Sequence, residues 1–179
     1  MGTSEISLKN REVKYLKDYS FGEFVSTIQN QPITLKEISA DTIWPIMNLA
    51  VANGQRSYVA PNANSIAEAY FSKEAWFRGI YLGDQPVGFV MLYADTEKPE
   101  YFLWRLMIDK DHQGNGYGYQ AMTQIIDHVK SLPEAKELKT SYVPGDGNPS
   151  PFYHKLGFEE TGEILEGEHV LRLDLPDPD

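Results

Sequence analysis

The chain has 179 residues, 41% of them hydrophobic, and no cysteine, which predicts a packed core and excludes disulfides, a thiolate nucleophile and a thiolate zinc site. A formal net charge of −10, spread along the chain, repels nucleic acid and favours a cationic small molecule as partner. The sequence shows neither a secretory leader pattern nor an apolar run of about 18 residues or more, so we expect a cytoplasmic protein without a membrane partner.

The first part of the chain carries no visible chemistry. Residues 1–31 mix charged and aromatic side chains without a sustained period, and short helices are expected near residues 8–18 and 21–29. We treat this segment as an N-terminal extension of unknown role. The main domain is expected at residues 32–176, starting with an alternating strand at residues 33–38, and a tail at residues 177–179 is expected to fray.

Two helices are expected next. Thr42 can cap the first, which has Pro45 in its opening turn and reads to about Ala52, and Ser65 is expected to cap the second. The loop between them, together with the second helix, is a candidate for one wall of a substrate site, because loops that join early helices to a sheet often line such sites. The candidate residues of this wall are Arg56, Tyr58, Glu68 and Glu74.

The rest of the chain alternates between strand and helix signals. Periodicity and turn residues predict a hairpin with strands at 79–82 and 87–93, a strand at 101–109, a helix at 116–131, a strand at 138–143, a short helix at 152–156 closed by Gly157, and a terminal hairpin at 158–175 that turns at Glu166-Gly167. The central unit is therefore strand–helix–strand, and its two strands should run parallel.

A glycine-rich turn stands between the central strand and its helix. Gly114, Gly116 and Gly118 precede or open the helix, where free backbone N–H groups form a cradle for an anion. A P-loop would require a Gly-Lys-Ser/Thr ending, which is missing. A dinucleotide site would require this turn in the first strand–helix unit, whereas it lies two thirds of the way along the chain. Both nucleotide sites are excluded.

The segment Gln113-Gly114-Asn115-Gly116-Tyr117-Gly118 resembles the Q/R-x-x-G-x-G/A signature of the GNAT family of N-acetyltransferases. Two flanking segments support the resemblance: LMID, which ends at Asp109, and FYHKLGF, which begins at Phe152. The longer string PGDGNPSPFYHKLGF is similar to bacterial spermine/spermidine (diamine) acetyltransferases. The resemblance extends from about residue 33 to residue 175.

This resemblance implies a fold and a cofactor site. The fold is α/β (α+β), a mixed and mostly antiparallel sheet with helices on both faces, splayed between the strands at 101–109 and 138–143. Acetyl-CoA would lie in the gap as co-substrate, with its pantetheine arm along the first strand and its pyrophosphate on the glycine-rich turn. The residues implied in binding it are Leu106, Met107, Ile108, Gln113, Gly114, Asn115, Gly116, Tyr117, Gly118 and Tyr119.

Tyr153 stands where the family's tyrosine acts as general acid toward the departing thiolate. Many members carry Asn seven positions before this tyrosine, where the present chain has Asp146, with Asn148 two residues later; either residue can replace it in the cofactor site. Some members place a glutamate base on the strand at 138–143, where this chain has Ser141, so no general base is assigned. A water chain to Glu68, Glu74 or Glu100 is one route for the proton.

Trp104, Arg105 and the histidines are the remaining residues considered as candidates for the site. Alternation predicts Trp104 and Arg105 on opposite faces of the central strand, one toward the acceptor cleft and the other toward packing. The four histidines show no i, i+4 pair, and we interpret them as surface or structural residues without a metal.

The sequence thus predicts an acetyl-CoA-dependent N-acetyltransferase acting by direct attack in a ternary complex. The favoured acceptor is the primary amine of a small cation, a polyamine or diamine. Other acceptors stay open: a protein N-terminus, an amino acid or an antibiotic amine. A non-catalytic acyl-CoA sensor and a homodimer also stay open.

Overall fold

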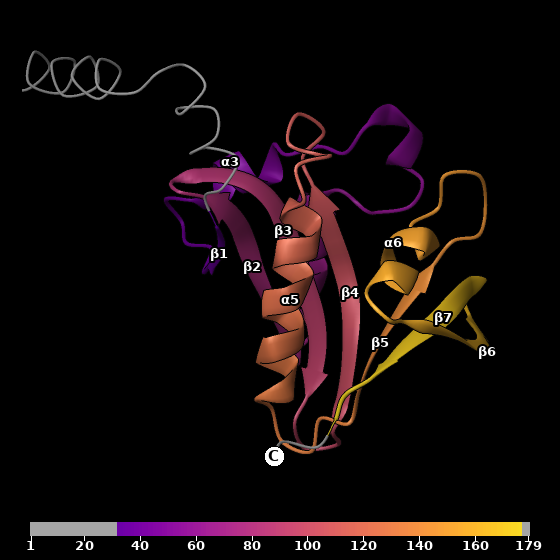
Figure 1. Ribbon diagram of the computed structural model, residues 1–179. Coiled ribbons are helices and arrows are strands. Elements are labelled where there is room, and N and C mark those ends of the chain that lie inside the picture. Colours follow the sequence, from indigo (N-terminus) through magenta and orange to yellow (C-terminus); the bar gives the residue numbers. More distant parts are fainter. Residues whose placement is uncertain (1–31, 177–179) are drawn as a thin grey trace, which may run out of the picture. The chain divides into compact units, whose positions relative to one another are not determined.

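The computed structural model describes residues 32–176, and the helices expected near 8–18 and 21–29 lie outside this range. The described residues form a seven-stranded sheet in the order β1-β2-β3-β4-β5-β7-β6 (Figure 1). Every neighbouring pair is antiparallel except β4–β5, which is parallel. The strands are β1 (Ile33–Lys36), β2 (Ala75–Leu82), β3 (Gln85–Asp95), β4 (Glu100–Ile108), β5 (Glu137–Tyr142), β6 (Glu159–Leu165) and β7 (Glu168–Asp174). The expected mixed, mostly antiparallel sheet is confirmed.

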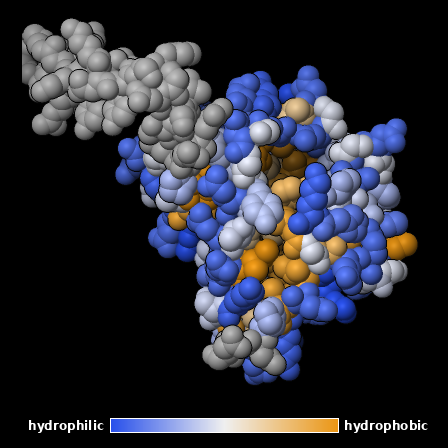
Figure 2. Space-filling view, in the orientation of Figure 1, coloured by the Kyte–Doolittle hydropathy of each residue, from blue (hydrophilic) through white to orange (hydrophobic). Residues whose placement is uncertain are grey.

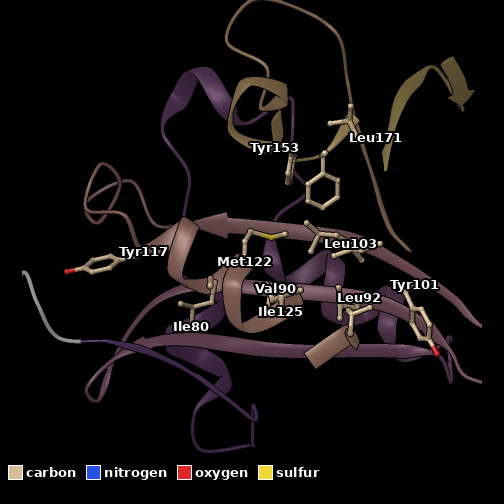
Figure 3. Close-up of a cluster of buried hydrophobic side chains, with 14 of the residues drawn as sticks. Ile80, Val90, Leu92, Tyr101, Leu103, Tyr117, Met122, Ile125, Tyr153 and Leu171 are labelled. Carbon is tan, nitrogen blue, oxygen red and sulfur yellow. The ribbon is translucent and has the colours of Figure 1, made fainter. Parts of the chain in front are cut away.

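Helices cover both faces of the sheet, as expected. One apolar cluster packs α5 (Tyr117–Lys130) against the sheet and includes Tyr153 of α6 (Ser150–Lys155) (Figure 3). A second cluster packs the other face against α3 (Ile43–Met47) and α4 (Asn62–Ala69), which are joined through the short 3-10 helix η1 (Asn53–Gln55). None of the helices in this part of the chain is long and apolar enough to cross a membrane.

The parallel strands β4 and β5 pair over a very short length. Their register contains only Phe102–Lys139 and Leu103–Thr140. Directly after Leu103, β4 bulges: Leu103 faces Leu92 of β3, Arg105 faces Met91, and Trp104 has no partner opposite. A bulge bends its strand and increases the local twist. Strand β4 therefore diverges from β5 beyond residue 103, and the two strands open as a V in Figure 1.

The first two helices differ from the expectation. The first ends at Met47 rather than near Ala52, because the backbone of Ala50 bonds elsewhere: its N–H donates to the carboxylate of Asp109 and its oxygen accepts from Lys110. The second helix starts at Asn62, and Ser65 is a buried residue inside it rather than its cap. Asn62 donates its side-chain amide to the oxygen of Ile46, which fixes the earlier start.

The turns follow the expected positions. Gly83, with φ of 61°, opens the two-residue turn between β2 and β3, in which Leu82 faces Gln85. Glu166 and Gly167, with φ of 51° and 90°, make the turn between β6 and β7. Gly157 closes α6 with φ of 92°. The three glycines adopt this left-handed backbone without strain, so the local sequence predicted where the turns lie.

Candidate active site

A cavity of about 950 Å³ opens where β4 and β5 diverge. In Figure 2, apolar surface lines a hollow between the start of α5 and α6, and hydrophilic side chains rim it. The predicted site residues that line the cavity are Arg56, Tyr58, Trp104, Arg105, Leu106, Met107, Ile108, Gln113, Gly114, Gly116, Tyr117, Gly118, Tyr119, Asn148 and Tyr153. Glu68, Glu74, Glu100, Asn115 and Asp146 are not among its lining residues.

The glycine-rich turn presents open backbone to this cavity. Gly114 and Gly116 have φ of 79° and 78°, and a Cβ at either would meet no atom within 4 Å. Gly116 is the N-cap of α5, with no side-chain cap and no acidic residue in the first turn. The N–H groups of a helix's first turn lack partners within the helix, and their partial positive charge favours an anion. The turn thus leaves space where an anionic group can approach the backbone.

Two polar side chains hold the turn in place. The amide nitrogen of Gln113 donates to the oxygen of Ile108 at 2.9 Å and to the side-chain oxygen of Gln55 at 2.8 Å. The amide nitrogen of Asn115 donates to the backbone oxygens of His112 and Gln113. Both amide groups are therefore engaged in shaping the turn. The contact with Gln55 also places the neighbouring Arg56 beside the glycine-rich turn.

The bulge in β4 corrects the expected orientation of Trp104 and Arg105. Trp104 packs in the cluster of α3 and α4, and Arg105 donates to the carboxylate of Glu68 in α4 at 3.1 Å. The guanidinium also lies 5.5 Å from the centroid of the Trp104 ring. Both side chains therefore point to the same face, because the extra residue of the bulge interrupts the alternation.

Tyr153 reaches the place where the sheet divides. Its side chain is 7% exposed and belongs to the cluster beneath α5 and α6 (Figure 3). Burial raises the pKa of Tyr153 to about 12, and the nearby Thr140 hydroxyl opposes the shift. Thr140 in turn donates to the oxygen of Leu103 at 3.1 Å, across the last β4–β5 pair. The phenol is therefore protonated at neutral pH and held at the vertex of the opening.

Asp146 and Asn148, the two predicted replacements for the family's asparagine, lie in the loop before α6. Asn148 lines the cavity, but its side chain is used within the loop: the amide nitrogen donates to the oxygen of Gly145, and the amide oxygen accepts from the N–H of Ser150. Asp146 contributes its backbone oxygen, which accepts from the Tyr58 hydroxyl at 2.8 Å. Asn148 thus shapes the loop at the cavity wall, while the exposed Asp146 side chain lies outside the lining.

None of the three predicted end points for a water chain lines the cavity. Glu68 is paired with Arg105, and Glu74 lies beside Lys73, which is 3.6 Å away. Glu100 starts β4 and stands roughly 26 Å from Ile108 at the usual rise of a strand.

His112 is the only one of the four histidines that lines the cavity within the described chain. Its Nδ1 faces the carboxylate of Asp109 at 3.5 Å, and its Nε2 lies 3.1 Å from the side-chain amide of Gln85. Among residues 32–176, no group of three or more His, Cys, Asp or Glu side chains is arranged to hold a metal ion.

Glu168 and Lys155 line the cavity without any functional signal in the sequence, and Ser141 stands out only as the position where some family members carry a glutamate base. Ser141 on β5 and Glu168 on β7 both line the cavity, and the hydroxyl of Ser141 donates to the carboxylate of Glu168. Lys155 of α6 also lines it. Strand pairing between β5 and β7 brings Ser141 and Glu168 together. Glu168 could have been predicted as a cavity residue only if the register between β5 and β7 had been known.

Comparison with known sequences identifies the architecture. The sequence model of the Acetyltransferase (GNAT) family matches residues 44–158, which include the glycine-rich turn and Tyr153. The chain belongs to this family. It is an acetyl-CoA-dependent N-acetyltransferase.

Relatives of this acetyltransferase agree in sequence and in fold. A probable spermine N(1)-acetyltransferase of Bacillus subtilis subsp. natto (strain BEST195) is 28% identical over 153 residues, covering 80% of this chain and 99% of the relative. A spermine/spermidine N(1)-acetyltransferase of Bacillus subtilis (strain 168) shows the same identity and coverage. The crystal structure of the PaiA N-acetyltransferase from Thermoplasma acidophilum in complex with coenzyme A shares the fold, with a TM-score of 0.61, 14% identity, and coverage of 80% of this chain and 99% of that chain.

Several features of the cavity in this acetyltransferase suit an acyl-CoA. The open glycine-rich turn suits a pyrophosphate, and Arg56 and Lys155 add positive charge to the lining. All residues of β4 from Leu103 to Ile108 line the cavity on the side where β5 has diverged. An extended pantetheine arm can pair with such a freed strand edge.

Proposed function

We propose that this acetyltransferase transfers the acetyl group of acetyl-CoA to a primary amine of a polyamine or diamine. The observation that carries the proposal is the single cavity into which the glycine-rich turn, the freed edge of β4 and Tyr153 all open. The acceptor class is supported by the two Bacillus subtilis relatives, which match along 80% of the chain.

The chain's own groups divide the work. Backbone N–H groups from Gly114 to Tyr119 hold the pyrophosphate, and the backbone of Leu106 and Ile108 pairs with the pantetheine arm. The N–H near Ile108 faces the thioester oxygen, where a fixed dipole stabilises developing negative charge without reorganisation. Acetyl-CoA supplies the activated acetyl thioester. Tyr58 and Trp104 form part of the acceptor side of the cavity, while Arg56, next to Gln55 and the turn, serves the phosphates.

Tyr153 is proposed as the proton donor to the leaving sulfur. Its pKa of about 12 keeps the phenol protonated at neutral pH. Full transfer from this acid to a thiolate whose conjugate acid has a pKa near 8.5 is uphill by about 5 kcal/mol. We therefore propose that Tyr153 donates while the carbon–sulfur bond breaks, and that a proton released by the attacking amine restores the phenol.

Substitution of Gly116 tests the cofactor site. Gly116→Glu places a bulky anion where the pyrophosphate would bind. Unit charges about 4 Å apart repel by about 4 kcal/mol near a protein surface. Acetyl-CoA binding measured by calorimetry should therefore weaken about a hundredfold or more. Gly162→Glu is the matched control, because Gly162 has nearly the same φ, 80°, and equally open surroundings but does not line the cavity. Equal affinity in the two variants would overturn the assignment.

A second class of acceptor is favoured by the charge of the cavity lining. Arg56, Arg105 and Lys155 are its Lys and Arg residues, whereas Glu168 is its one carboxylate among the residues described. Arg105 is paired with Glu68, but cationic side chains such as Arg56 and Lys155 suit the carboxylate of an amino acid or of a peptide acceptor as well as phosphates. An acetyl-transfer assay with thiol detection across polyamines, amino acids, peptides and aminoglycosides decides between these acceptors.

The same assay addresses a non-catalytic acyl-CoA sensor. In an enzyme, Tyr153→Phe should lower turnover by about a hundredfold while acetyl-CoA affinity is retained, because general acid catalysis contributes a factor of this size. A sensor would show no turnover to lose. The cytoplasmic location, the lack of a nucleic-acid partner and the homodimer alternative stay predictions.

A further inference from the structure

A serine–glutamate pair forms part of the cavity wall at the diverging end of β5. The Ser141 hydroxyl donates to Oε2 of Glu168, and both residues line the cavity. Within residues 32–176, Oε1 of Glu168 accepts no hydrogen bond and neither oxygen takes part in an ion pair. Serine thus fixes one carboxylate oxygen, and the other can accept a hydrogen bond from a ligand.

Strand register places this pair on the opposite face of the sheet from Tyr153. Ser141 pairs with Val170 of β7, so alternation puts Ser141, Val170 and Glu168 on one face. Thr140 pairs with Leu171 and points to the other face, where Leu171 and Tyr153 belong to the same buried cluster. Because both groups line one cavity, the opening between β4 and β5 connects the two faces. The carboxylate of Glu168 and the phenol of Tyr153 therefore lie on opposite sides of the opening.

Glu168 is also the only carboxylate that lines the cavity in the part of the chain described. Glu68 lies near the same wall, but its carboxylate is already paired with Arg105 at 3.1 Å. A protein with a net charge of −10 thus presents only one unpaired negative group to a bound amine. This group stands on the side of the sheet from which an amine can attack while Tyr153 serves the leaving sulfur.

We propose that Glu168, held by Ser141, binds the ammonium group of the acceptor and accepts its proton. This inference rests on the proposed function and supplies the general base that the sequence left unassigned. One proton passes from the ammonium nitrogen to the Glu168 carboxylate, and the neutral amine forms a bond to the acetyl carbon. The carbon–sulfur bond breaks, the sulfur takes the proton of Tyr153, and the amine's second proton returns to the phenol. The products are the N-acetylated amine, CoA thiol and one proton, which Glu168 releases to solvent.

Glu168→Gln tests this role without removing the local packing, because the glutamine amide oxygen can still accept from Ser141. Glu166→Gln is the matched control: it removes one negative charge from the same hairpin at an exposed turn position that does not line the cavity. With spermidine as acceptor, Glu168→Gln should raise KM about tenfold and lower kcat about a hundredfold at saturating amine, the size expected for loss of a general base. Acetyl-CoA affinity should stay unchanged, and Glu166→Gln should match the wild type.

A second measurement separates this inference from the proposed function. Calorimetry of spermidine with the CoA complex should show binding in the wild type and in Glu166→Gln, weakened about tenfold in Glu168→Gln. If the wild type binds spermidine in this way but transfers no acetyl group to it, the proposed function fails and the amine site at Glu168 stands. If Glu168→Gln equals Glu166→Gln in KM, kcat and spermidine affinity, the inference is overturned and the proposed function stands. If Glu168→Gln has a raised KM but the same kcat as the wild type, Glu168 binds the amine without accepting its proton, and its role as proton acceptor is overturned.

Discussion

The hydroxyl of Tyr58 donates a hydrogen bond of 2.8 Å to the backbone oxygen of Asp146, 88 residues further along the chain. The bond joins the loop after η1 to the loop before α6, and both loops line the cavity. Gly145 makes this approach possible, since a Cβ there would lie 2.9 Å from the Tyr58 hydroxyl. Two loops that carry few backbone bonds of their own are thereby held in a conformation in which they can receive a ligand.

Removal of this hydroxyl should weaken cofactor binding. In Tyr58→Phe the two loops lose their bond, and their ordering must then be supplied when the ligand binds. A hydrogen bond contributes about 0.5–1.5 kcal/mol, so the dissociation constant of acetyl-CoA measured by calorimetry should rise about two- to tenfold. The matched control is Tyr142→Phe, which removes a phenol–carboxylate bond to Glu160 of 2.9 Å outside the cavity lining. Equal effects of the two changes would contradict the bridging role.

The glycine-rich turn should respond oppositely to alanine at two neighbouring positions. Gly116 has φ of 78°, so Gly116→Ala should lower the free energy of unfolding by about 1–2 kcal/mol through backbone strain. Gly118 is helical, and its added Cβ would make ordinary contacts of 3.5 Å with Phe152 and 3.7 Å with Ile108. Gly118→Ala should therefore raise this free energy by up to about 1 kcal/mol. Urea denaturation measures both, and a shift in the same direction would contradict the assigned backbone.

The raised pKa of Tyr153 predicts a pH-dependent stability. Below about pH 10 the phenol is protonated in both the folded and the unfolded chain, so its contribution is constant. Between about pH 10 and the folded pKa of about 12, only the unfolded chain loses the proton, so the free energy of unfolding falls by about 2–3 kcal/mol.

The difference in stability between the wild type and Tyr153→Phe isolates this effect. Tyr93, Tyr101 and Tyr142 also have pKa values raised first by burial, but they are present in both proteins and cancel. Denaturation of the ligand-free chain at several alkaline pH values gives the difference. It should shrink as the pH rises above about 10. A difference that stays flat would mean that Tyr153 ionises with its ordinary pKa in the folded chain.

Local rules explain why much of the fold could be predicted from the sequence. Gly83, Gly157 and Gly167 adopt positive φ where turns were expected, because only the local backbone decides these positions. The buried face of α5 could also be predicted from the sequence, because Ala121, Ile125 and Val129 recur at the spacing of one helix face and all three are buried.

Long-range contacts explain what could not be predicted. The first helix ends before Ala50, whose N–H donates to the carboxylate of Asp109, 59 residues away. The bulge at Trp104 depends on how β3 pairs with β4. Glu168 enters the cavity only because β7 pairs with β5 in one particular register. These features depend on partners that are distant along the chain, so alternation and propensity within a short window carry no information about them.

Asp109 is one of these long-range partners and gives the last prediction. Its side chain is buried, and its carboxylate accepts the N–H groups of Ala50 at 2.9 Å and Asp111 at 3.1 Å. Burial alone would raise the pKa of Asp109, but these hydrogen bonds, together with the nearby His112 ring, outweigh it and lower the pKa. The stability that Asp109 contributes is therefore present above its unfolded pKa near 3.9 and is lost as the pH falls through the lower, folded pKa.

Asp109→Asn should lower the free energy of unfolding at neutral pH by about 1–3 kcal/mol, because the amide can accept only one of the two N–H groups through its oxygen and presents a donor to the other. This penalty should shrink as the pH falls below about 4, because the unfolded wild-type chain binds a proton at Asp109 there before the folded chain does. Urea denaturation from about pH 3 to pH 7 measures it, with Asp127→Asn on the exposed face of α5 as control for the lost charge. Since Asp109 ties the start of the 50–61 loop to the end of β4, the same change should also weaken acetyl-CoA binding. A variant that is destabilised yet binds acetyl-CoA as tightly as the wild type would show that the loop's position does not depend on this anchor.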